Sequence, residues 1–133
     1  MVRADDIIDY VRRIVARFEP HRVVLFGSYA YGGPDGDSDV DLLITRTRWS
    51  TSPLTTAGKM RIELGVPFPM DLIVRTEADV ARRLAGGDFF VREIIEKGIT
   101  LYAADDPRVG SQGRVRLRRR LRGAALAQEV AAR

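Results

Sequence analysis

Apolar residues recur along the chain with two different periods, which predict alternating helices and strands. Ile7, Val11 and Ile14 repeat at helical spacing within residues 4–18, so this segment is expected to form an amphipathic helix. Residues 22–27 hold a short apolar run that ends in glycine, which is typical of a buried strand. The same two patterns predict further strands at 38–45, 69–75 and 99–102 and further helices at 52–65, 76–84 and 87–98.

The order of these elements predicts the fold class. Strands that alternate with helices indicate an α/β (α+β) fold, in which a small mixed β-sheet is flanked by helices. The segment GSYAYGG after the strand at 22–27 is expected to be a tight turn that opens a short helix. Phe89 and Phe90 are expected to pack into the core from the helix that contains them; a surface that binds a partner is the alternative.

Charge divides the chain near residue 103. The whole chain carries a net charge of +4, but residues 104–133 hold eight arginines and three acids, a net charge of +5, which leaves −1 for residues 1–103. We therefore expect one domain at 1–103 and a basic C-terminal extension at 104–133. Gly, Ser and Gln near its start are typical of a linker, so the extension is expected to be solvated or disordered, or else to bind an acidic partner or RNA.

Composition narrows the class of protein further. The chain contains no cysteine, which excludes disulfides and thiolate metal ligands and suits a reducing compartment. The charged, periodic N-terminus does not resemble a signal peptide. No apolar run approaches the roughly 20 residues that a membrane-spanning helix needs. We therefore expect a cytoplasmic protein without a membrane-spanning helix.

The stretch PDGDSDVDL places aspartate at positions 35, 37, 39 and 41. A calcium-binding EF-hand loop would need glycine at its sixth position and glutamate at its twelfth, where this chain has Val40 and Arg46. In a strand, Asp39 and Asp41 point instead to one face. The apolar residues that follow indicate a buried strand with no local Lys or Arg, so the pair predicts Mg²⁺ or Mn²⁺ binding; a solvated polar face is the alternative.

Two other segments carry candidate site residues. Gly27 and Ser28 end a predicted strand, where glycine lets the backbone approach an anion and the serine hydroxyl and following N–H groups can bind phosphate oxygens. Asp71 precedes Leu-Ile-Val on a later strand, much as Asp41 precedes Leu-Leu-Ile. Taken singly, these features are typical of a turn and of a surface acid. Together they predict three acids on two adjacent strands, facing a phosphate-binding turn.

The order Gly-Ser, a gap, Asp-x-Asp and a third Asp resembles the signature of nucleotidyltransferases of the DNA polymerase beta type, over roughly residues 20–75. The short chain resembles the minimal nucleotidyltransferases, the MNT group, which are commonly the antitoxins of HEPN-domain RNase toxins. Many members read Gly-Ser-x-Ala-Arg-Gly, where this chain has Tyr31 in place of the arginine. That replacement removes a cation that could help to bind phosphates.

The resemblance implies a site and a reaction. Asp39, Asp41 and Asp71 would be the catalytic residues and would hold two Mg²⁺ ions, or Mn²⁺. Gly27 and Ser28 would bind the phosphates of the nucleotide. The substrate would be ATP, and AMP would be transferred to a hydroxyl group, in particular a tyrosine of a cognate HEPN toxin, so that the chain acts as an antitoxin by AMPylation. A partner chain or a second copy would complete the site.

Two alternative functions remain open at this point. The chain could mask a toxin without catalysis, or it could transfer the nucleotide to an RNA 3′ end or to a small molecule. RNA binding needs basic surface to neutralise phosphates. Because residues 1–103 are slightly acidic, nucleic acid is the less favoured acceptor.

Overall fold

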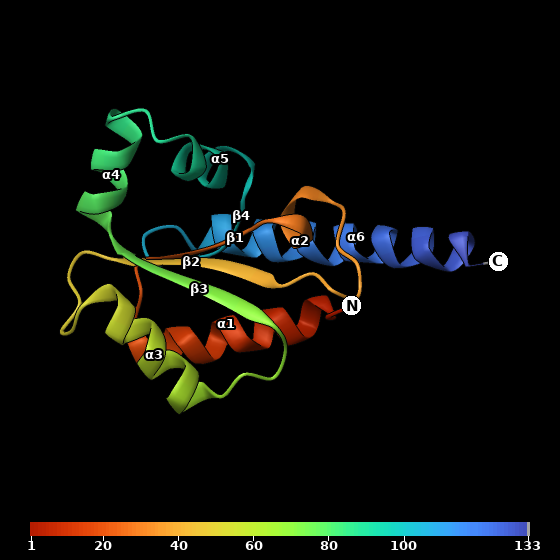
Figure 1. Ribbon diagram of the computed structural model, residues 1–133, viewed down its shortest axis with the longest axis horizontal. Helices are drawn as coiled ribbons and strands as arrows, with labels where there is room; N and C mark the ends of the chain where they lie inside the picture. Colours follow the sequence, from red (N-terminus) through yellow and green to blue (C-terminus); the bar gives the residue numbers. More distant parts are fainter. Residues whose placement is uncertain (133) are drawn as a thin grey trace.

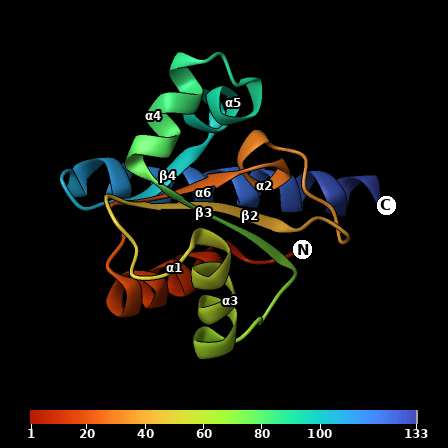
Figure 2. The same cartoon turned by 60° about the vertical axis from the view of Figure 1, so that its left-hand side comes forward.

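The computed structural model describes residues 1–132, which form a four-stranded mixed β-sheet with helices on both faces (Figures 1 and 2). The strands lie side by side in the order β3-β2-β1-β4. Strand β1 runs antiparallel to β2 and to β4, whereas β2 and β3 are parallel. The predicted fold class is therefore confirmed. The strands are β1 (Arg22–Phe26), β2 (Val40–Arg46), β3 (Met70–Thr76) and β4 (Ile99–Ala103).

Helices cover the two faces of the sheet unequally. The larger apolar cluster joins residues of α1, α3 and α6 to one face, and the smaller cluster joins Ile94 of α5 to the other. Figure 2 shows α4 and α5 together on the side opposite α1 and α3. The helices are α1 (Ala4–Phe18), α2 (Ser28–Tyr31), α3 (Pro53–Leu64), α4 (Glu77–Ala85), α5 (Phe89–Lys97) and α6 (Pro107–Ala131). None of the helices described is long and apolar enough to cross a membrane.

Local sequence explains most of the helix boundaries. Helix α3 begins after Ser52, whose hydroxyl accepts a hydrogen bond from the Thr55 N–H at 3.2 Å. Helix α5 begins after Asp88, whose carboxylate accepts one from the Val91 N–H at 3.0 Å. Both are N-cap bonds that satisfy a backbone donor of the first turn. The boundaries of α3 lie within one residue of those that the sequence predicts, and the boundaries of α5 lie within two.

Strand β2 starts later than the sequence suggests. It begins at Val40, whose N–H donates to the Pro69 carbonyl at 3.0 Å. The residues before it form a turn instead, because the Asp35 N–H donates to the Ser38 hydroxyl and the Asp37 N–H to the Asp35 carboxylate. Asp39 therefore lies just before the strand rather than in it.

The C-terminal segment differs from the solvated or disordered extension expected from composition. Residues 107–131 form the single helix α6, and its Leu117 and Leu121 belong to the larger apolar cluster. The glycine at 113 is not a linker residue, because a Cβ there would lie 1.8 Å from the Thr100 carbonyl oxygen. Glycine thus lets α6 pack closely on β4. The end of α6 extends beyond the body of the molecule (Figure 1), although Gln128 still donates a hydrogen bond to the Pro34 carbonyl at 2.8 Å. Arg133 lies outside the described residues.

Candidate active site

The carboxyl end of β1 meets the amino ends of β2 and β3, and the candidate acids lie there. Asp41 is the register partner of Phe26 on one side and of Asp71 on the other. Register partners on adjacent strands point to the same face of a sheet. Phe26 belongs to the smaller apolar cluster under α5, so Asp41 and Asp71 share the face that α5 covers.

The turn after β1 packs directly against Asp41. Gly27 has a φ of 73°, in the region that favours glycine. A Cβ at Gly27 would lie 2.1 Å from Oδ2 of Asp41. Any other residue at position 27 would therefore collide with this carboxylate as well as strain the backbone. Ser28 follows at once and begins α2, so the turn, the serine and Asp41 form one contiguous surface.

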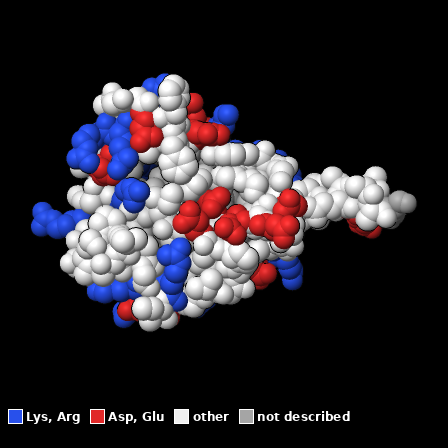
Figure 3. Space-filling model, viewed as in Figure 1, with Lys and Arg blue, Asp and Glu red and all other residues white. Residues whose placement is uncertain are grey.

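The three acids repel one another at this edge of the sheet. Burial raises the pKa of Asp41 to about 6, and the negative charges of Asp71 and Asp39 raise it in the same direction. Asp39 is exposed, and so is Asp71. Figure 3 shows acidic side chains in a row across this face, where β2 and β3 begin. The nearest recorded cation is Arg61 of α3, whose Nη2 lies 4.0 Å from Oδ1 of Asp71.

The donor set fits a hard divalent cation by its chemistry. Carboxylate oxygens are the ligands that Mg²⁺ and Mn²⁺ prefer, and a cation would relieve the repulsion that raises the pKa of Asp41. Within residues 1–132, however, no three acidic or histidine side chains already surround a common metal position. Like charges gather around one point only when a cation joins them, so the carboxylates provide ligands without a preformed cage.

Phe90 and Tyr31 lie near Asp41. The side chain of Phe90 is 54% exposed, and its ring meets that of Phe26 edge-on at 5.7 Å. Phe89 is 82% exposed, so the expectation that both phenylalanines pack in the core is wrong. The pKa of Tyr31 lies above its usual value, chiefly because the side chain is partly buried. A hydrogen bond with the Gly27 backbone opposes this shift, and the charges of Glu93 and Asp41 add to it.

Sequence reasoning could not place Phe90, Glu93 or Arg61 at this edge. Their elements, α5 and α3, join the site only through the packing of helices on the sheet. Tyr31 carried a signal, because the motif that the sequence resembles has arginine at this position. The structure puts its ring next to the turn that is expected to bind phosphates.

The mixed sheet, with a glycine turn packed against Asp41, has the elements that the resemblance to nucleotidyltransferases leads us to expect. Residues 6–101 match the nucleotidyltransferase domain family, so the chain belongs to that family. A search of curated proteins finds no match.

Two solved structures are similar to the chain. One is a candidate nucleotidyltransferase from Sulfolobus solfataricus, with 17% identity over 78% of this chain and 83% of that one, and a TM-score of 0.56. The other is a mutant of the toxin–antitoxin MntA–HpeT, with 18% identity over 98% and 99% of the two chains and a TM-score of 0.45. At this identity the first similarity shows the fold.

Proposed function

We propose that this protein is a divalent-cation-dependent nucleotidyltransferase that moves AMP from ATP onto a hydroxyl group of a partner protein. Membership of the nucleotidyltransferase family supports the class of reaction. The observation that carries the proposal is the register that sets Asp41 beside Asp71 and against the Gly27 turn. It supports the proposal because carboxylates that could bind a metal lie beside the turn whose N–H groups could bind phosphates.

The proposed reaction is a displacement at the α-phosphorus of ATP. The acceptor oxygen forms a bond to that phosphorus, the bond to the bridging oxygen of the β-phosphate breaks, and pyrophosphate leaves. When bound, a divalent cation would neutralise phosphate charge and acidify the acceptor hydroxyl. Asp39, Asp41 and Asp71 would hold this cation. Asp71 is exposed, so an acceptor can reach it, and Asp71 would also take the proton of the acceptor hydroxyl.

The turn after β1 would bind the leaving phosphates. The missing side chain at position 27 makes room for the carboxylate of Asp41, and the Gly27 N–H and the Ser28 hydroxyl would donate to the phosphate oxygens. The exposed ring of Phe90 next to Phe26 offers a surface on which the base can stack. The ring of Tyr31 would have to move aside to free its hydrogen bond with the Gly27 backbone.

The partner in this proposal is a HEPN-type toxin, and the modified group is one of its tyrosines. This assignment rests on the resemblance of the sequence motifs to minimal nucleotidyltransferases. The small fold is consistent with it, because the described residues hold a single sheet with no second domain to bind an acceptor.

Intact-mass measurement tests the proposal. The chain is co-expressed with the product of the neighbouring gene, purified with Mg²⁺ and ATP, and both chains are weighed. A gain of whole AMP units on the partner that disappears in Asp41→Asn and persists in Asp37→Asn is expected. A stable complex without added mass would instead establish a masking antitoxin. No complex at all would redirect the search to RNA ends and small molecules.

A further inference from the structure

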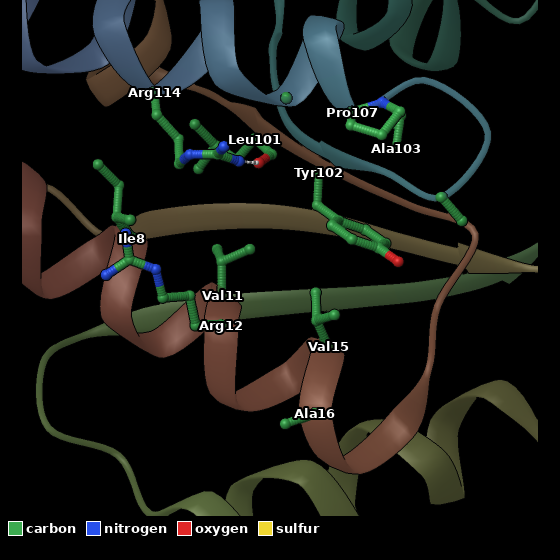
Figure 4. Close-up of a pocket in the computed structure, with 12 residues that line it drawn as sticks. Ile8, Val11, Arg12, Val15, Ala16, Leu101, Tyr102, Ala103, Pro107 and Arg114 are labelled. Atoms are coloured by element: carbon green, nitrogen blue, oxygen red, sulfur yellow. Dashed lines mark hydrogen bonds between the residues drawn. The ribbon is translucent and has the colours of Figure 1, made fainter.

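A cavity of about 420 Å³ lies between α1, β4 and the start of α6 (Figure 4). Leu101 lines it and belongs to the larger apolar cluster, whereas Phe26, next to the aspartates, belongs to the smaller one. The cavity therefore opens on the face of the sheet opposite the candidate active site. Its size is in the range of pockets that bind small organic molecules.

Small residues keep this cavity open. Ala16, Ala103 and Gly110 line it where larger side chains would fill the gap between α1 and α6. Gly110 cannot be enlarged without movement, because a Cβ there would lie 3.2 Å from both the Leu101 carbonyl oxygen and Nη1 of Arg114. Arg12, Ala16, Ala104 and Pro107 line it and are exposed, so the space is open to solvent and a ligand can enter it.

The walls are apolar except for two arginines. Ile8, Val11 and Val15 of α1 face Leu101 across the cavity (Figure 4). None of the described residues that line it is acidic. The cavity thus combines a hydrophobic interior with a net positive charge.

Both guanidinium groups lie at one end of the cavity. Figure 4 shows Arg114 reaching down from α6 and Arg12 rising from α1 near Ile8, with Tyr102 at the other end. Arg114 donates one hydrogen bond to the Leu101 carbonyl at 3.0 Å. Among residues 1–132, Arg12 has no recorded hydrogen bond or ion pair. At least one cation is therefore free to bind an anion at this end.

We propose that this cavity, named here the α1–α6 pocket, binds a small molecule with an apolar body and one carboxylate. The apolar body would lie along Val11, Val15 and Leu101, and the carboxylate would meet Arg12 and Arg114. A nucleotide is a poor fit, because its several charges would have to lie against apolar walls. An uncharged apolar molecule would leave the arginines unused.

Calorimetric titration with decanoate tests this proposal on the whole chain. Decanol and decyltrimethylammonium serve as the uncharged and oppositely charged comparisons. Saturable binding of one decanoate per chain is expected, with decanol at least about 10-fold weaker because it lacks the charge-assisted bonds. Arg12→Gln should weaken decanoate about 10-fold by the same argument, and Ala16→Trp should block binding by filling the pocket from its exposed rim.

Matched variants and a mapping step keep the test decisive. Arg116→Gln on the exposed side of α6 and Ala81→Trp on α4 should bind decanoate as the wild type does. Amide shifts on adding decanoate should centre on residues 8–16 and 101–114. The proposal is overturned if decanoate does not saturate, if decanol binds equally well, or if Arg12→Gln and Arg116→Gln bind alike. Selective binding of an acidic peptide in place of decanoate would also overturn it.

Discussion

The two ends of the β2–β3 pair both carry acids, but their surroundings differ. At the end where Arg46 pairs with Thr76, burial favours a raised pKa for Glu77, yet hydrogen bonds from Arg22 and Thr45 outweigh it and lower the pKa. Arg22 reaches Glu77 through two nitrogens, at 3.0 and 3.2 Å. At the end where Asp41 pairs with Asp71, the neighbours of Asp41 are also acids and its pKa rises to about 6.

This difference separates structural acids from candidate functional ones. Glu77 finds its positive partner within the chain, as does Asp79, which accepts hydrogen bonds from Arg82 and Arg83. For Asp41, burial and the charges of Asp71 and Asp39 all raise the pKa, so a bound cation would supply the compensation that Glu77 and Asp79 find within the chain. A fold that keeps an uncompensated acid accepts a stability cost that function can explain.

Replacing the carboxylate of Asp41 should have the largest effect. Asp41→Asn is expected to lower nucleotidyl transfer at least about 100-fold, because the group that would hold the cation is lost. Asp37→Asn, in the exposed turn before β2, should keep full activity. Radiolabel transfer from ATP under single-turnover conditions measures both. Equal activity of the two variants would remove Asp41 from the catalytic residues.

A side chain at position 27 should damage the same end of the sheet. Gly27→Ala is expected to cost about 1–3 kcal/mol of unfolding free energy, the range for backbone strain, and to displace Asp41. Gly36→Ala is the control, since a Cβ there meets nothing within 4 Å. Urea unfolding compares the two. A Gly27→Ala protein as stable as Gly36→Ala would contradict the close packing of the turn on Asp41.

The exposed aromatic ring next to the acids should affect nucleotide binding rather than folding. Phe90→Ala is expected to weaken ATP binding about 10-fold, in line with the loss of one stacked base. Phe89→Ala is the matched change one residue away, and its side chain is 82% exposed. Calorimetry with Mg²⁺ present measures both. If Phe89→Ala has the larger effect, the base does not stack on Phe90.

At the opposite end, loss of an acid should affect stability and spare activity. Glu77→Gln is expected to lower the unfolding free energy by about 1–2 kcal/mol, because charge-assisted hydrogen bonds with Arg22 are lost. Since the pKa of Glu77 is lowered by folding, its stabilisation is full above about pH 4.5, the usual value, and disappears as pH falls through the lowered pKa. Unfolding between pH 3 and 7 should show this slope in the wild type and not in Glu77→Gln.

The smallest expected effect is a gain in stability. Because the folded protein raises the pKa of Asp41, its charged form is disfavoured at neutral pH when no metal is bound. Asp41→Asn should therefore stabilise the metal-free protein, by less than about 1 kcal/mol because solvent still screens this partly buried group. Thermal unfolding in EDTA measures the change. A loss of stability would mean that Asp41 has a structural partner.

Much of the fold follows from local patterns, and the surroundings of the site do not. Helix α1 follows from a short apolar period, and helices α3 and α5 begin at the caps Ser52 and Asp88. Each of these signals acts within a few residues, so it can be read from the sequence. The glycine at 113 was misleading, because glycine serves both flexible linkers and close packing. Only the fold shows that it meets Thr100.

The site residues show the same limit. The spacing of Asp39, Asp41 and Asp71 and the Gly27–Ser28 pair could be recognised along the chain. The pair ends one predicted strand, and the aspartates lie in the first residues of two later ones. The register that sets Asp41 beside Asp71 depends on pairing between strands far apart in sequence. The approach of Arg61 and Phe90 depends on helix packing, which no local pattern encodes.

Cation-dependent ATP binding tests the central contrast between the two ends of the sheet most directly. Calorimetric titration of ATP with Mg²⁺ and with EDTA is made on the wild type, Asp41→Asn and Glu77→Gln. The account predicts binding with Mg²⁺ only, retained in Glu77→Gln and lost in Asp41→Asn. Equal ATP binding in Mg²⁺ and in EDTA would contradict the assignment of the acidic end as the active site. So would ATP binding that survives in Asp41→Asn and is lost in a folded Glu77→Gln.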